Sequence, residues 1–211
     1  MSKAAGFGKV TALIVTATAL VVALGIPEVT GGQSRQNLYQ CEGCEAIHER
    51  SFDGLSWLDT IANLTEPGDR LVLTGSVVLP DGKTPAAGVI IYAYHTNAAG
   101  LYPKRGDEQG WGRRHGYLRG WARTNAAGEY RFETIRPGTY PDRAGPAHIH
   151  LTVKEPERQE YWLDDVVFTD DMLVTPEYRR NREGRGGSGI VTPVRDSTGT
   201  WTVRRNIVLE P

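Results

Sequence analysis

The stretch of sequence that decides the fold runs from Pro137 to Val153 and reads Pro-Gly-Thr-Tyr-Pro-Asp-Arg-Ala-Gly-Pro-Ala-His-Ile-His-Leu-Thr-Val. Its second half, 147–153, alternates apolar and polar residues, which is the pattern of a β-strand buried on one face. His148 and His150 would stand on the other face, about 7 Å apart along the backbone. Neutral imidazole is the commonest metal ligand in proteins, so the pair predicts a metal site. The alternative for a bare His-x-His is two half-buried histidines that bond to neighbouring groups.

The residues just upstream favour iron over other metals. Pro137-Gly138-Thr139-Tyr140-Pro141 forms a turn that places a tyrosine eight positions before His148. Phenolate is a hard anionic ligand that favours ferric iron, whereas zinc sites usually draw on cysteine, histidine and carboxylates. A tyrosine after such a turn also occurs as simple surface packing.

From about Gly75 to Val153 the chain resembles the intradiol ring-cleavage dioxygenases, which include the protocatechuate 3,4-dioxygenases and catechol 1,2-dioxygenases. The blocks that carry this resemblance are Asp81-Gly82-Lys83, Tyr94 to Tyr102, Thr124 to Phe132, Thr134 to Pro141 and Pro146-Ala147-His148-Ile149-His150. The last two blocks, in this order, are the most specific part of the pattern.

The resemblance implies a non-haem Fe(III) held by two tyrosines and two histidines, which by the family pattern are Tyr102, Tyr140, His148 and His150. It also implies a small-molecule catechol and O2 as substrates. The ring would open between its two hydroxylated carbons to give a muconate-type product.

One position departs from the family pattern. The family carries an arginine immediately before Pro-Ala-His-Ile-His, where this chain has Gly145, and Arg143 lies two residues earlier. That arginine contacts the substrate in the family, so Arg143 is the candidate for its role here. Tyr117, Trp121 and Arg114 are further candidates to line the substrate pocket.

Tyr117 also competes with Tyr102 for the role of first phenolate. Arg113 and Arg114 lie close to Tyr117 in sequence, and neighbouring cations lower a phenol pKa. Tyr102 follows the turn at the end of a predicted strand, where the family pattern places its first tyrosine. The prediction is therefore Tyr102.

Two other classes of protein fit parts of the pattern. Gly128-x-Tyr130-x-Phe132 and the Pro-Gly turn also look like the small transthyretin-like β-sandwich modules, in which such residues shape turns and core. A zinc enzyme would use His148 and His150 with His95 or His115, because three histidines and a water make a catalytic zinc site.

Composition indicates one domain of moderate size with extensions. The chain has 211 residues, 24 basic and 25 acidic side chains, and a formal net charge of −1. Such balanced charge does not favour nucleic acid as a partner, and the segment from Arg179 to Arg185 reads as a solvated loop. Self-association into a homo-oligomer is left open.

Residues 1–36 read as a signal peptide or an N-terminal membrane anchor. Lys3 and Lys9 precede an apolar run from Val10 to Ile26, and a polar segment follows. We therefore expect an exported protein, with cleavage and membrane association left open.

Residues 37–66 are expected to form an extension with a short helix or irregular segment. They contain Cys41 and Cys44, the only cysteines in the sequence. In an oxidising compartment such a pair can close a small disulfide loop.

Residues 67–211 are expected to form an all-β domain, a β-sandwich of the intradiol dioxygenase type. The predicted strands are Leu71–Leu79, Val89–His95, Arg119–Thr124, Glu129–Ile135, Ala147–Val153, Asp165–Phe168 and Trp201–Leu209. Short strands at this spacing, without a long helical pattern, are typical of a sandwich. Tyr102 to Gly116 reads as a long loop, and Gly184 to Gly189 as a mobile cover or a flexible connection.

Overall fold

The computed structural model describes residues 38–211, together with Met1 and Gly6. Apart from those two positions, the export or anchor segment expected at 1–36 lies outside the described residues. In the part that the structure describes, no helix has the length and apolar character needed to cross a bilayer.

Short strands dominate the described chain, as expected for an all-β protein. The elements in chain order are η1 (Cys44–Glu49), β1 (Leu58–Thr60), β2 (Arg70–Val78), β3 (Ile90–His95), α2 (Gly112–His115), β4 (Arg119–Arg123), β5 (Glu129–Ile135), β6 (His148–Lys154), β7 (Tyr161–Trp162), β8 (Val166–Phe168), α3 (Pro176–Arg180), β9 (Ile190–Val191), β10 (Val194–Arg195), β11 (Trp201–Arg204) and β12 (Ile207–Val208).

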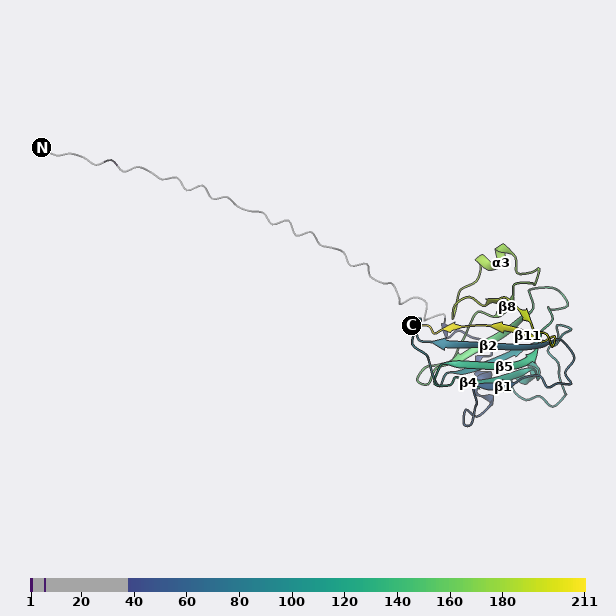
Figure 1. Ribbon diagram of the computed structural model, residues 1–211. Coiled ribbons are helices and arrows are strands. Elements are labelled where there is room, and N and C mark those ends of the chain that lie inside the picture. Colours follow the sequence, from purple (N-terminus) through teal and green to yellow (C-terminus); the bar gives the residue numbers. More distant parts are fainter. Residues whose placement is uncertain (2–5, 7–37) are drawn as a thin grey trace. The chain divides into compact units, whose positions relative to one another are not determined.

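The strands form two sheets that pack as a sandwich (Figure 1). One six-stranded sheet has the order β1-β5-β2-β11-β10, with β12 also paired to β2. The other six-stranded sheet has the order β4-β3-β6-β8-β9, with β7 also paired to β6. Leu73 and Phe132 from the first sheet share one buried core with Ile91 and Leu151 from the second. The predicted β-sandwich is confirmed.

The segment expected as an extension contributes to this sandwich. Its strand β1 pairs in parallel with β5. The 3-10 helix η1 buries Ala46 and Ile47 against Ile90, Tyr92 and Trp121, which lie on the outer face of the second sheet. A second, smaller apolar cluster therefore lies outside the main core, beneath η1.

The last predicted strand, Trp201–Leu209, is interrupted. The structure has β11 and β12 instead, with Arg205 and Asn206 between them. Asn206 turns its side chain to β2, where its Oδ1 accepts from Ser76 N at 3.2 Å. The side chain thus replaces a backbone partner at the point where the regular ladder stops.

A buried histidine ties the two sheets together. His95, at the end of β3, is fully buried, and its Nε2 lies 2.7 Å from Thr134 Oγ1 on β5 of the other sheet. Its Nδ1 lies 2.7 Å from the carbonyl oxygen of Thr96 and donates to it, because a carbonyl can only accept. Burial favours the neutral ring, in which Nε2 accepts from the threonine hydroxyl. Burial lowers the pKa of His95 to about 4.

This histidine should make folding stability depend on pH. An unfolded histidine titrates near pH 6.5. Below about that pH, His95 binds a proton in the unfolded chain but stays unprotonated in the folded protein. Stability should be full above about pH 6.5 and fall by roughly 3 kcal/mol as the pH drops towards 4. Urea unfolding across this range should show a shallower pH slope for His95→Gln than for the wild type. Identical slopes in the two proteins would contradict the assignment.

Arg205 is the largest fully buried side chain among the described residues. Its guanidinium donates to the carbonyl oxygens of Gly186 at 2.9 Å, Gly187 at 3.0 Å, Arg185 at 3.2 Å and its own neighbour Asn206 at 2.8 Å. These carbonyls belong largely to the glycine-rich segment that the sequence presented as a mobile cover or a flexible connection. Arg205 instead fixes that segment to the edge of the sandwich.

Loss of this guanidinium should be costly. Arg205→Lys keeps the charge but cannot reach several carbonyls at once, so buried acceptors lose their donors. We expect a loss of about 3 kcal/mol in the free energy of unfolding, measured by urea titration. Arg204→Lys is the matched control, because Arg204 is the exposed neighbour and its replacement should change stability little. Equal stability of the two variants would show that the carbonyl contacts are unimportant.

Candidate metal centre

The strand β6 presents two imidazoles on the outer face of the second sheet. Ile149 and Leu151 are buried in the sandwich core, so the alternation of the strand turns His148 and His150 the other way. The two rings meet edge to face, with centroids 4.5 Å apart. The predicted placement of both histidines on one face is what the structure shows.

Two tyrosine hydroxyls complete a closed group of four donor atoms. Tyr102 Oη lies 2.7 Å from Tyr140 Oη and 2.9 Å from His150 Nε2. His148 Nε2 lies 3.2 Å from Tyr140 Oη and 3.0 Å from His150 Nε2. The four residues named from the sequence as ligands are thus brought together around one point.

Two glycine turns allow the tyrosines to approach each other. A Cβ on Gly100 would lie 1.8 Å from the carbonyl oxygen of Thr139, and Gly100 has a φ of 77°. A Cβ on Gly138 would lie 2.4 Å from the carbonyl oxygen of Ala98. Only residues without a side chain fit this contact, which sets the segments before Tyr102 and Tyr140 against each other.

The far nitrogen of each imidazole is held by an acceptor. His148 Nδ1 lies 2.7 Å from the carbonyl oxygen of Pro146, and His150 Nδ1 lies 2.9 Å from Asp165 Oδ1. Each Nδ1 therefore carries a proton, and in the neutral ring each Nε2 points its lone pair at the centre of the group. Burial lowers the pKa of His148, which keeps its ring neutral.

The two tyrosine oxygens and two histidine nitrogens have too few protons to make a hydrogen bond at each of their mutual contacts. Only the two tyrosine hydroxyls carry protons at the centre, yet four contacts of 2.7–3.2 Å join the donor atoms. At least two of these contacts therefore bring lone pairs together. A cation at the centre removes this conflict, and the phenolate and imidazole donors suit ferric iron. The residues present fit such an ion.

Burial favours the protonated form of both tyrosines in the donor group. Burial is the main cause that raises the pKa of Tyr102 and of Tyr140. Neither phenol would ionise near neutral pH on its own. A bound cation reverses this preference, because it stabilises the phenolate form directly.

Asp165 belongs to this centre and was not singled out from the sequence. Ligand atoms of His148, His150 and Asp165 lie within 4.8 Å of one another, which is close enough for one ion. The carboxylate, however, contacts Nδ1 of His150, on the side of the ring away from the four donors. Asp165 is therefore the outer partner that orients His150, an arrangement common at metal sites.

The two further histidines considered for a zinc site do not complete one. Both nitrogens of His95 are already bonded on the core side of the sheet. The ring of Tyr94 stacks on His115 at 3.8 Å and on His150 at 4.4 Å between centroids. Two rings cannot stack on the same face of Tyr94, so His115 and His150 lie on its opposite faces. The Tyr94 ring therefore separates His115 from the donor group.

A cavity of about 270 Å3 opens over the donor atoms. Its lining residues are Glu42, Tyr94, Tyr102, Trp111, Arg114, His115, Tyr140 and His150. Arg114 lies there as expected from the sequence. Glu42 and Trp111 were not expected. Glu42 comes from the loop between Cys41 and Cys44, which form a disulfide, and Trp111 comes from the segment just before α2.

The other sequence candidates lie elsewhere than in this cavity. Trp121 is buried under η1, and its Nε1 donates to the carbonyl oxygen of Ile47 at 2.9 Å. The Tyr117 hydroxyl donates to Glu66 at 3.1 Å, and Arg105 lies over the Tyr117 ring. Arg143 is exposed in the turn after Tyr140, with a φ of 55°.

These placements have simple physical reasons. Trp121 faces outward from β4 beside Tyr92 of β3, which is the part of the sheet that η1 covers. Burial raises the pKa of Tyr117, and so does the Glu66 carboxylate that its hydroxyl contacts; both oppose the phenolate form. Of the two tyrosines weighed as the first phenolate, only Tyr102 joins the donor group.

Comparisons with known proteins relate this chain to dioxygenases. The model of a family described as Dioxygenase matches residues 55–183. The protocatechuate 3,4-dioxygenase beta chain of Burkholderia cepacia is 33% identical over 129 residues, which cover 54% of this chain and 54% of that protein. Catechol 1,2-dioxygenase 1 of Acinetobacter lwoffii is 30% identical over 166 residues, covering 65% of this chain and 50% of that protein. The chain thus spans about half the length of the curated relatives it matches.

Solved structures show the same fold. The dioxygenase domain of a dioxygenase carbohydrate-binding protein fusion from Streptomyces sp. SirexAA-E has a TM-score of 0.54 at 21% identity, covering 77% of this chain and 94% of that one. Catechol 1,2-dioxygenase from Acinetobacter sp. ADP1 has a TM-score of 0.55 at 21% identity, with coverages of 73% and 57%. An intradiol ring-cleavage dioxygenase from Tetranychus urticae has a TM-score of 0.52 at 20% identity, with coverages of 72% and 85%.

Asp165→Ala should weaken metal binding without unfolding the sandwich. The change leaves Nδ1 of His150 without its acceptor, so the ring loses its fixed orientation. We expect a loss of about 10- to 100-fold in iron affinity, measured by competition with a chelator. Asp53→Ala, at an exposed position near η1, serves as the control and should bind iron as the wild type does. Unchanged affinity in Asp165→Ala would rule out the orienting role.

Proposed function

Because the chain belongs to the intradiol ring-cleavage dioxygenase family, we propose that it is an Fe(III)-dependent enzyme. The proposed reaction opens the ring of a catechol between its two hydroxylated carbons and consumes O2. The observation that carries the proposal is the closed group of Tyr102, Tyr140, His148 and His150. At least two contacts within this group join donor atoms without a proton between them, and a bound cation would stabilise them. Phenolate and imidazole donors suit ferric iron.

Iron bound there would act as a Lewis acid that favours the anionic forms of phenols and catechols. The two histidines serve as neutral donors whose orientation is set by Pro146 and Asp165. Tyr102 follows a turn that is closed by backbone hydrogen bonds from Gly100 to Asn97 at 3.0 Å and from Asn97 to Leu101 at 2.8 Å. We assign Tyr102 the permanent phenolate role.

Tyr140 is the better candidate for moving a proton. It precedes the turn 141–144, whose four residues are all exposed. Its Oη lies in the same cavity as the substrate site, next to Tyr102 Oη. We propose that Tyr140 Oη accepts one hydroxyl proton of the catechol as the substrate binds.

The cavity limits the size and character of the substrate. At about 270 Å3 it lies near the lower end of small-molecule pockets, which suits a single aromatic ring. The aromatic side chains of Tyr94 and Trp111 form part of its lining. Gly145 offers no side chain to the substrate, and we assign no substrate contact to Arg143.

We also propose that the protein acts outside the cytoplasm. The proposal rests on the apolar run from Val10 to Ile26 with its preceding lysines. Cys41 and Cys44 form a disulfide, which is a bond that persists in oxidising compartments.

The proposed activity can be tested on the iron-loaded protein with unsubstituted catechol. We expect a visible absorption band from phenolate-to-iron charge transfer, a shift of that band on anaerobic addition of catechol, and uptake of one O2 per ring opened to a dicarboxylic acid. A colourless protein that binds zinc in preference to iron, without O2 uptake, would refute the proposal.

The assignment of the first phenolate gives a separate test. Tyr102→Phe should lose or strongly alter the visible band and cut activity severely, because one of two phenolates is missing. Tyr117→Phe is the matched control and should keep the band, since its hydroxyl is engaged by Glu66 away from the donor group. Spectra of the two iron-loaded variants distinguish the assignments, and the reverse pattern would make Tyr117 the ligand.

A further inference from the structure

The cavity over the donor group is closed on one side by the disulfide loop from Cys41 to Cys44. Glu42 from this loop lines the cavity together with Tyr102, Tyr140 and His150. A second cavity of about 310 Å3 lies beside it and is lined by Cys41, Glu42 and Gly43 along with His150 and Asp165. The loop is thus a wall of the site, although it precedes the segment matched by the family model, 55–183.

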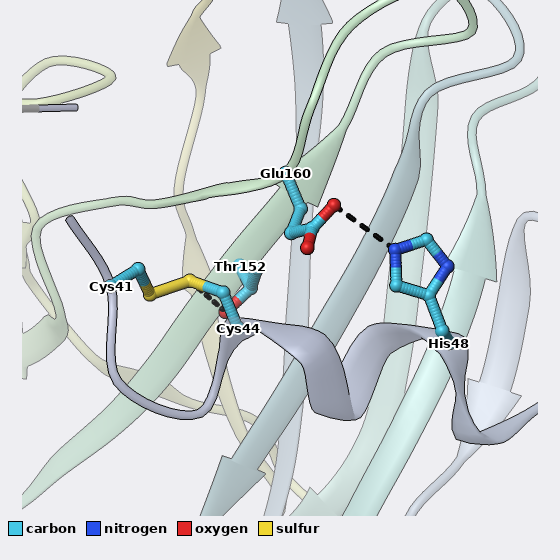
Figure 2. Close-up of a disulfide and its surroundings, with 5 residues drawn as sticks. All are labelled: Cys41, Cys44, His48, Thr152 and Glu160. Carbon is cyan, nitrogen blue, oxygen red and sulfur yellow. Dashed lines mark hydrogen bonds and ion pairs between the residues drawn. A yellow bond between two sulfur atoms is a disulfide. The ribbon is translucent and has the colours of Figure 1, made fainter. Parts of the chain in front are cut away.

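The loop is anchored to the strand that carries the histidines (Figure 2). Cys41 and Cys44 are joined by a disulfide, and Cys44 Sγ lies 3.7 Å from Thr152 Oγ1 on β6. One turn later, His48 Nε2 lies 3.0 Å from Glu160 Oε2. Ile47 of η1 is fully buried. These attachments fix the position of the backbone that carries Glu42.

The opposite wall carries a cation that Glu42 neutralises. Arg114, on α2, forms an ion pair with Glu42. A second contact joins the two walls, because Trp111 N donates to Glu49 Oε1 at 2.6 Å. Burial lowers the pKa of His115 to about 4, so this lining residue is uncharged at neutral pH. Among the described residues that line the cavity, apart from the two tyrosines assigned as iron ligands, only Glu42 and Arg114 then carry a full charge.

This charge arrangement bears on which ring substituents a catechol could carry in the cavity. A carboxylate on the ring would meet the Glu42 carboxylate and could reach Arg114 only by displacing it, whereas an uncharged ring leaves the pair intact. We propose that Glu42 is a specificity-determining residue that favours uncharged catechols over carboxylated ones, an inference that rests on the proposed function. The disulfide loop holds Glu42 over the site. The pair is exposed to solvent, so its effect on binding is moderate.

The test compares binding of two probes, catechol and 3,4-dihydroxybenzoate, to the full iron-loaded chain without oxygen. Calorimetry gives both dissociation constants, so no turnover is needed. Glu42→Gln frees Arg114, and the affinity for the carboxylated probe relative to catechol should rise about fivefold. Arg114→Gln leaves Glu42 unpaired, and this relative affinity should fall by a similar factor. Glu45→Gln removes a neighbouring exposed carboxylate that does not line the cavity, and the relative affinity should stay as in the wild type.

The outcomes separate the two proposals. If both probes bind and Glu42→Gln leaves their relative affinity unchanged, or if Glu45→Gln changes it equally, the role of Glu42 is overturned while the proposed function stands. If neither probe binds the wild-type protein, the proposed function fails and the role of Glu42 fails with it. Opposite shifts in Glu42→Gln and Arg114→Gln would support the assignment.

Discussion

The alternation of strand β6 is the constraint on which the rest of the structure depends. A β-strand sends successive side chains to opposite faces, so Ile149 and Leu151 must enter the core if His148 and His150 are to face outward together. Burial of the apolar face fixes the register of the strand, and the same register fixes the two imidazoles. The site therefore takes its rigidity from the sandwich core, and substitutions on either face of β6 affect a common framework.

Everything else at the site is brought to this pair of histidines. The glycine contact between the segments around Gly100 and Gly138 places the two phenols, and Asp165 orients one ring. The loop that carries Glu42 and the helix that carries Arg114 then enclose the space above them. The sandwich supplies the ligands, and the segments that lie over its outer face supply the walls of the cavity.

Sequence reasoning identified the features that depend on local pattern. The alternation around His150 and the turn before Tyr140 are visible in consecutive residues, and the resemblance to a known family added Tyr102. Asp165 was missed because its role depends on pairing between strands: β8 lies antiparallel to β6, which sets Asp165 opposite His150 only after folding. Trp121 was misplaced for a related reason, since nothing in its own strand shows that η1 covers that part of the sheet.

The hydrogen bonds from Arg205 to the glycine-rich segment affect the order in which the site can form during synthesis. The carbonyl oxygen of Arg185 accepts both from Arg205 and from the backbone N–H of Asp164, and the next residue, Asp165, orients His150. A chain emerging from the ribosome releases its N-terminal part first, so the histidines leave long before Arg205 does. The support behind His150 is complete only when Arg205 has been synthesised. Nascent chains that end before Arg205 would carry all four candidate ligands without the contact that fixes the segment beside Asp165.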